Sequence, residues 1–187
     1  MTVARLLGYW REDLPELDPL LALSSEQVSA YEQQRERGGR WPDPRTLVDP
    51  GWREYERSAV IEYLRTGSLV NQYRGLSPCR FCGRHNGSAE LTDGAFCWPE
   101  GLAHYLDAHE VRLPVESVEH AVSSYAKQRR LPSPEFDHLG QRDRAWPGIE
   151  FEALLWTPQR PADEYGPDLE RDPTWWLQQA TLLERDH

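Results

Sequence analysis

The chain has 187 residues and a formal net charge of −10, and 39% of its residues are apolar. Its eight Trp, eight Tyr and four Phe exclude a disordered chain, because such chains are poor in aromatic residues. The acidic balance argues against a general DNA-binding protein, since neutralisation of phosphates dominates nucleic-acid affinity. The same charge suits a basic protein partner.

No part of the sequence approaches the roughly 20 consecutive apolar residues that cross a membrane. Residues 1–10 contain no apolar stretch long enough for a signal peptide. The three cysteines lie within residues 79–97 and do not resemble the framework of a secreted disulfide protein. We therefore expect a cytoplasmic protein without membrane association.

Residues 1–76 are expected to form a helical N-terminal part. Ser24 and Gln27 match a capping box, and a glycine pair follows at the other end, which predicts a peripheral helix over residues 25–37. A loop with three prolines comes next, over residues 40–50.

A second helix is expected to begin with Asp49 as its N-cap and Pro50 at its first position. Apolar residues then recur at helical spacing as far as Leu64. Residues 68–73 predict a short strand that leads into the cysteine motif.

The central part predicts a β-hairpin followed by two helices. Asp93 and Gly94 are a strong turn signal between two short apolar runs, so the hairpin is expected over residues 87–98. Of the two helices that follow, one should begin at Pro99 and the other at Pro114, with an apolar face on the second.

Residues 132–187 are expected to form an acidic, proline-rich C-terminal segment, with five basic and twelve acidic side chains. Residues 149–156 predict a strand, and Asp172 with Pro173 should cap a final helix. That helix carries two adjacent tryptophans, which need a surface on which to dock. The predicted fold class is α+β, a mainly helical single domain with a knuckle, hairpin and helix unit at its centre.

The residues with distinctive chemistry gather in residues 77–131. Cys79 and Cys82 form a C-x2-C pair, and His104 and His109 form H-x4-H on the first predicted helix. Two thiolates and two imidazoles can close a tetrahedral shell around Zn²⁺, and a closed shell stabilises a fold rather than catalysing a reaction. A step of five residues turns a helix by about 140°, so the helix should loosen at the second histidine.

In the order of its elements, this segment resembles Cys2His2 and treble-clef zinc fingers over about residues 77–110. The resemblance implies Zn²⁺ bound by the two cysteines and two histidines. It departs from the Cys2His2 pattern because 21 residues separate Cys82 from His104, against roughly 12–15. Three further motifs resemble bacterial proteins that carry no assigned activity, and they imply no function: Trp41-Pro-Asp-Pro44, Asn86-Gly-Ser-Ala-Glu-Leu-Thr-Asp-Gly94 and Trp98-Pro-Glu-Gly-Leu-Ala-His104.

Other arrangements stay open at the level of the sequence. Cys97, His85 or Asp107 can replace one of the four ligands. Without metal, the two motif cysteines would be buried free thiols beside helix histidines. A catalytic zinc would need three protein ligands and an open position for water. A deaminase is excluded because no H-x-E motif lies upstream of the cysteines.

The leading hypothesis is a non-enzymatic, zinc-stabilised protein that binds another macromolecule, expected to be a protein and, given the acidic ends, a basic one. A zinc hydrolase with an open coordination site is one alternative. The other is a nucleic-acid binder, because residues 63–89 contain no acidic side chain. The arginines of this stretch can instead pair with carboxylates elsewhere; they are Arg65, Arg74, Arg80 and Arg84.

Overall fold

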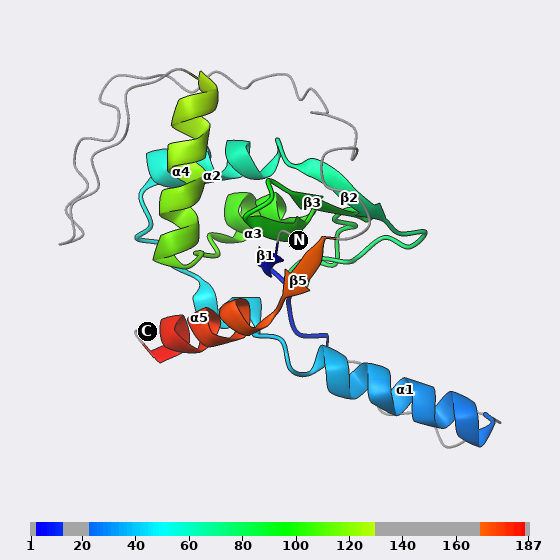
Figure 1. The fold of residues 1–187 in the computed structure, drawn as a ribbon. Helices are drawn as coiled ribbons and strands as arrows, with labels where there is room; N and C mark the ends of the chain where they lie inside the picture. Colours follow the sequence, from blue (N-terminus) through cyan, green and yellow to red (C-terminus); the bar gives the residue numbers. More distant parts are fainter. Residues whose placement is uncertain (1–2, 13–22, 130–168, 186–187) are drawn as a thin grey trace.

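The computed structural model describes residues 3–12, 23–129 and 169–185, and the structural statements below concern these ranges. They combine five α-helices with a five-stranded mixed sheet, which confirms the predicted α+β class, and about half of the described chain is helical (Figure 1). None of these helices is long and apolar enough to cross a membrane. The strand predicted over residues 149–156 lies outside the described residues.

The sheet has the strand order β2-β3-β4-β1-β5. Strand β1 (Val3–Leu6) is parallel to both of its neighbours, β4 (Phe96–Pro99) and β5 (Glu170–Asp172), whereas β3 (Ala89–Thr92) is antiparallel to β4 and to β2 (Ser68–Gln72). The predicted hairpin and the strand before the cysteines are thus confirmed. The sequence analysis missed β1 and β5, since such short strands show too little alternation to be recognised.

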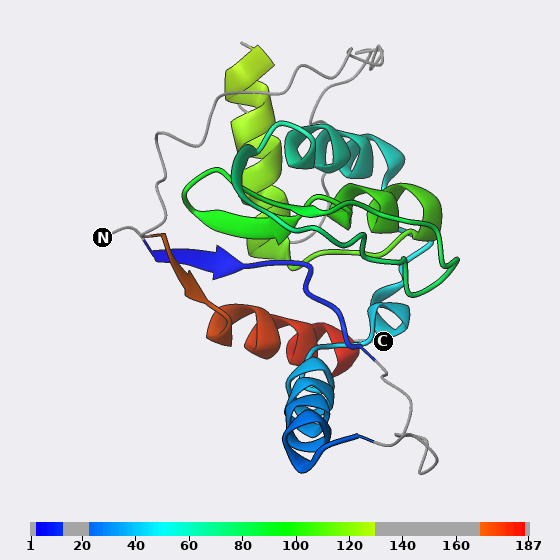
Figure 2. The same cartoon turned by 90° about the vertical axis from the view of Figure 1, so that its right-hand side faces the viewer.

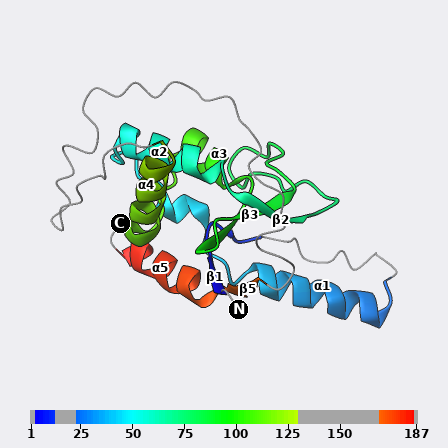
Figure 3. The same cartoon turned by 45° about the horizontal axis from the view of Figure 1, so that its top comes forward.

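Helix α1 (Ser25–Gly38) begins at the predicted capping box. The hydroxyl of Ser24 accepts a hydrogen bond from the Gln27 amide at 3.2 Å, and the Gln27 side chain accepts one from the Ser24 amide at 2.8 Å. Only Gly38 of this helix is buried. The helix therefore projects from the rest of the fold, as Figures 1 and 3 show, and the prediction of a peripheral helix is confirmed.

Helix α2 (Glu54–Leu64) begins later than predicted, with Arg53 rather than Asp49 as its N-cap. Asp49 instead caps a turn, in which its carboxylate accepts the amide of Gly51 at 2.9 Å. The same carboxylate receives the Arg112 guanidinium at 2.6 Å. This ion pair ties the turn to the segment between α3 and α4, so Asp49 is not available as a helix cap.

Helix α3 (Leu102–His109) also begins later than predicted, because Pro99 is the last residue of β4. The amide of Glu100 continues the hairpin by donating to the Ala89 carbonyl at 2.9 Å. The chain leaves the sheet only after this bond, which fixes the point where the helix starts relative to the hairpin.

Helix α4 (Val115–Arg129) follows Pro114 as predicted, and α5 (Thr174–Arg185) begins after Asp172, whose carboxylate accepts the Thr174 amide at 2.8 Å. The proline-rich loop contains one unpredicted turn of 3-10 helix, η1 (Pro44–Leu47). Proline fits the first position of such a turn because its missing amide has no partner to lose there.

The helices lie on two sides of the sheet. Helices α2, α3 and α4 pack together, and α5 packs along β1 and η1 (Figure 2). The predicted docking of α5 occurs through Trp176, which is fully buried, contacts Trp10 edge-on and donates to the Tyr9 carbonyl at 2.8 Å. On the other side, the buried Trp98 donates to the Leu64 carbonyl at 3.0 Å.

Asp93 holds the hairpin turn against two helices. One carboxylate oxygen accepts the amides of Ala95 and Phe96, and the other accepts the Tyr63 hydroxyl of α2 at 2.7 Å and lies 2.5 Å from Nε2 of His120 on α4. Burial alone would raise the pKa of Asp93, but the bonds to His120, Phe96 and Tyr63 outweigh it and lower the pKa. A carboxyl with a lowered pKa stabilises the fold above its unfolded-state pKa, and this contribution is lost as pH falls through the folded-state pKa.

Replacing Asp93 by Asn should lower the free energy of unfolding at pH 7 by about 1–3 kcal/mol, because buried hydrogen-bond partners lose their ionised acceptor. The difference from wild type should shrink as the pH falls through the lowered pKa of Asp93, where the wild-type carboxyl is protonated too. Urea unfolding across this pH range measures both effects. Glu32→Gln, on the exposed surface of α1, is the control. Equal stability of Asp93→Asn and wild type at pH 7 would contradict this assignment.

Candidate metal centre

The C-x2-C motif forms the tip of a long hairpin whose two arms are β2 and β3. Beyond the ends of both strands the pairing reaches Tyr73, is interrupted at residues 74–76, and resumes at the motif itself. The amide of Tyr73 donates to the Ser88 carbonyl at 2.7 Å. Closer to the tip, the amide of Ser77 donates to the Gly87 carbonyl at 3.0 Å, and the amide of Cys79 donates to the Arg84 carbonyl at 2.8 Å. These bonds tie the two cysteines to the hairpin that extends from the sheet.

The tip itself is a tight knuckle. The amide of Gly83 donates to the Cys79 carbonyl at 2.9 Å, and Gly83 has φ of 69°, a left-handed conformation that favours glycine. The amide of Phe81 points at the Cys79 sulfur, with 3.4 Å between nitrogen and sulfur. Cysteine binds metals through this sulfur, so the amide can support a metal-bound sulfur with a hydrogen bond.

The fold brings together all four residues that the sequence analysis named as ligands. One ligand atom from each of Cys79, Cys82, His104 and His109 lies within 4.8 Å of the other three. The Cys79 sulfur is 3.4 Å from Nε2 of His109, and the Cys82 sulfur is 3.4 Å from Nε2 of His104. A tetrahedron with Zn–S of about 2.3 Å and Zn–N of about 2.0–2.1 Å has a sulfur–nitrogen edge of about 3.6 Å. The group can therefore hold a metal ion.

The helix loosens at its second histidine, as the five-residue spacing requires. His109 is the last residue of α3, and Glu110 follows with φ of 53°. The Glu110 amide donates to the carbonyl of Tyr105, five residues back instead of four. The rings of His104 and His109 stand almost perpendicular, at 88°, with their centroids 5.0 Å apart. Both Nε2 atoms can thus face the knuckle.

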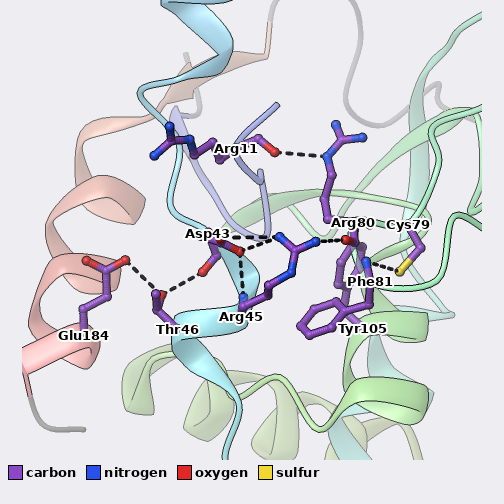
Figure 4. Close-up of polar contacts among 9 residues, drawn as sticks. All are labelled: Arg11, Asp43, Arg45, Thr46, Cys79, Arg80, Phe81, Tyr105 and Glu184. Atoms are coloured by element: carbon purple, nitrogen blue, oxygen red, sulfur yellow. Dashed lines mark hydrogen bonds and ion pairs between the residues drawn. The ribbon is translucent and has the colours of Figure 1, made fainter. Parts of the chain in front are cut away.

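Two aromatic residues that the sequence analysis did not single out support the centre. The ring of Phe81 stacks on His109, with 4.4 Å between centroids and 9° between planes. The Tyr105 hydroxyl accepts the amide of Arg80 at 2.9 Å, which joins α3 to the knuckle (Figure 4). Burial raises the pKa of Tyr105 to about 12, so its hydroxyl stays neutral at physiological pH. The only sequence signal that could have indicated this role is that Phe81 and Tyr105 are the direct neighbours of Cys82 and His104.

The knuckle is also held from outside by two arginines (Figure 4). Arg45 of η1 donates to the carbonyl of Arg80 and pairs with Asp43 at 3.2 Å. Arg80 itself donates to the Arg11 carbonyl at 3.0 Å and lies 3.7 Å from a carboxylate oxygen of Glu12. These contacts connect the knuckle to η1 and to the segment after β1.

The surroundings of His104 favour its neutral form. Burial lowers the pKa of His104, and the positive charges of His109 and Arg84 lower it further, against a weaker opposite effect of Asp107. A lowered pKa favours the neutral imidazole, which is the form that binds metals.

The three rival ligands lie apart from this group. Cys97 is fully buried on β4, 4.0 Å from the Tyr9 hydroxyl, and burial raises the pKa of its thiol. Asp107 lies 3.4 Å from Arg65. His85 pairs with Pro78 through the backbone of the knuckle. None of the three belongs to the cluster that the described residues form.

Two carboxylates near the ends of α3 would be the candidates for a general base if the metal were catalytic. Glu100 accepts the Ser88 amide at 3.0 Å, and Glu110 pairs with Arg57 at 2.8 Å. Both carboxylates hold the structure together through these contacts.

The basic stretch beside the knuckle divides into paired and unpaired arginines. Arg65 pairs with Glu62 at 2.8 Å, and Arg80 pairs with Glu12. Within the described ranges, Arg74 and Arg84 form no ion pair, and both are exposed. The expectation that these arginines pair with carboxylates is therefore met for two of the four.

Comparisons of the chain with protein-family models, with curated proteins and with solved structures found no match. The interpretation of the centre accordingly depends on its own geometry and on the chemistry of its residues.

The knuckle is fastened to the start of α3 by a close backbone approach. The side-chain amide of Asn86 donates to the Gly101 carbonyl at 2.9 Å. A Cβ atom at Gly101 would lie only 2.0 Å from the backbone oxygen of Asn86. Any side chain at this position must therefore push the knuckle away from the helix that carries the histidines.

Replacing Gly101 by Ala should lower the free energy of unfolding by about 1–3 kcal/mol and weaken metal binding, because the added methyl group separates the two halves of the centre. Gly75→Ala is the matched control, since a Cβ there meets nothing within 4 Å. Urea unfolding and competition with a metal chelator measure the two effects. Identical behaviour of the two variants would contradict the proposed role of this contact.

Proposed function

We propose that this chain is a zinc protein in which a closed Cys2His2 site joins the tip of the β2–β3 hairpin to helix α3. In this proposal the metal is structural, and the zinc-finger-like unit that it stabilises binds another protein. The observation that carries the proposal is the convergence of four ligand atoms within 4.8 Å, with two sulfur–nitrogen contacts of 3.4 Å.

The ligand set favours zinc over other common metals. Two thiolates and two imidazoles are a frequent structural zinc combination, whereas Mg²⁺ and Ca²⁺ take oxygen ligands. The sulfur–nitrogen contacts lie close to the tetrahedral edge of about 3.6 Å that zinc requires.

Two features support a structural rather than a catalytic metal. Four protein ligands fill a tetrahedral shell and leave no position for a reactive water. The carboxylates of Glu100 and Glu110 already have structural partners. Apparent binding free energies of structural zinc are about 10–16 kcal/mol in finger peptides, which equals or exceeds the whole stability of a typical domain. Metal binding would therefore decide whether the hairpin tip folds.

The partner is proposed to be a protein because the stretch beside the knuckle offers few unpaired cations for phosphates. Of the four arginines beside the knuckle, only Arg74 and Arg84 lack an ion pair within the described chain. A nucleic-acid binder relies on many such contacts. Eight of the twelve acidic residues of the C-terminal segment lie in 130–168, outside the described residues, so the expectation of a basic partner, which concerns the acidic ends and not the hairpin, stays a prediction.

Elemental analysis of the purified protein tests the metal. Wild type should carry one zinc per chain, and Cys82→Ser and His104→Ala should lose it, because each variant removes one side of the tetrahedron. Cys97→Ser is the matched control and should keep its zinc, since Cys97 lies outside the cluster. Wild type without zinc, or Cys82→Ser with a full complement of zinc, would contradict the proposal.

A further inference from the structure

Among the described strands, the outer arm of the long β2–β3 hairpin is an edge of the sheet. Strand β2 is the last strand in the order β2-β3-β4-β1-β5 and pairs only with β3. Among the described residues, no backbone hydrogen bond reaches its outer side. We name residues 68–77, which comprise β2 and the segment after it, the hairpin edge. Such an edge offers unpaired amides and carbonyls to another strand.

Exposed apolar side chains gather on the hairpin edge. Leu69, Tyr73 and Leu76 have exposed fractions of 37%, 51% and 55%, and they are three of the seven large hydrophobic residues that are exposed in the described chain. The strand itself contains no charged residue and no proline, which are the usual means of protecting an edge. Its one irregularity is a shift of register between Leu69 and Asn71. The edge is therefore suited to receive a partner.

Arginine is the charged residue type of the hairpin edge and of the knuckle, and the nearest carboxylates, Glu90 and Glu100, lie across the hairpin and are bound to Arg171 and to the Ser88 amide. No acidic residue occurs in residues 63–89. Arg74 lies within the edge and Arg84 lies on the returning arm of the same hairpin, and neither has an ion pair among the described residues. Carboxylates of an approaching segment would find cations there without competing with internal ion pairs.

We propose that the hairpin edge binds an extended, acidic segment of a partner protein, which adds a strand beside β2; this proposal rests on the proposed zinc-stabilised binding function. Main-chain hydrogen bonds to β2 supply affinity in strand addition, and side chains of the incoming strand supply specificity. Here Leu69, Tyr73 and Leu76 contact its apolar side chains, while Arg74 and Arg84 pair with its carboxylates. The metal fixes the far end of the hairpin and so keeps the edge extended before binding.

Two other occupants fit the edge less well. A second copy of the chain would bring its own Arg74 beside the same cationic edge, and like charges placed across a strand pair are unfavourable. A nucleic acid would meet only two unpaired arginines on a chain of net charge −10. An acidic peptide can form hydrogen bonds with the unpaired backbone groups of β2 and ion pairs with the two arginines.

Nuclear magnetic resonance on the ¹⁵N-labelled full chain tests the proposal, with a ten-residue peptide that alternates glutamate and valine as the probe. The protein is first shown to contain one zinc per chain, so that a failure of docking is distinguished from a failure of the metal site. The expected result is a set of amide shifts within residues 68–77 on addition of this peptide. A peptide that alternates lysine and valine should cause none.

Arg74→Glu should weaken binding of the acidic peptide by about fivefold or more, the size of one exposed ion pair. Arg40→Glu, which makes the same charge change at an exposed position outside the hairpin edge, should leave the affinity within about twofold.

The proposal is overturned if the peptide leaves the amide signals of residues 68–77 unshifted or if both variants bind the peptide alike. Preferential binding of a thymidine decanucleotide would also overturn it and assign the edge to nucleic acid. Slow hydrogen exchange of these amides in the free protein would show that the chain or a second copy already covers the edge.

Discussion

The contact between the hairpin tip and helix α3 is the constraint on which the rest of the structure depends. Cys79 and Cys82 arrive on the hairpin, and His104 and His109 arrive on the helix that follows its last strand. The register of the sheet decides whether they meet, because a slip of one residue turns every side chain of a strand to the opposite face. The two sulfur–nitrogen distances of 3.4 Å therefore depend on how the whole chain from β2 to α3 is folded.

The three antiparallel strands β2, β3 and β4, with the hairpin tip that carries the cysteines, are anchored at three places. At one end, Asp93 fixes the β3–β4 turn to α2 and α4. In the middle, the buried carboxylate of Glu90 accepts the Tyr9 hydroxyl and receives Arg171 of β5 at 3.0 Å, which links the hairpin to the segment after β1 and to β5. At the far end, the cysteines face the histidines. The first two anchors are made by protein groups alone, whereas the third brings together four residues that can hold a metal ion.

Local sequence patterns were enough to predict those features of the structure that depend on residues close together in the chain. The capping box of α1, the Asp93 turn and the four cluster residues are such cases, since each pattern spans a few positions or a recognisable spacing. Strands β1 and β5 were missed because their parallel pairing joins residues about 165 positions apart and leaves no local period. The start of α2 was placed wrongly because Arg112 recruits Asp49, and the start of α3 because the hairpin extends past Pro99. The stacking of Phe81 on His109 and the approach of Gly101 to Asn86 arise only from the tertiary fold.

In the proposed account, a closed metal site holds the hairpin, and the hairpin presents a cationic edge that no strand of the described chain covers. X-ray absorption at the zinc edge of the zinc-loaded protein tests the central claim of this account most directly. The account predicts two sulfur neighbours at about 2.3 Å and two imidazole nitrogens at about 2.0–2.1 Å, with no further ligand. A shell with one sulfur or none, or with an oxygen in place of an imidazole, would contradict it.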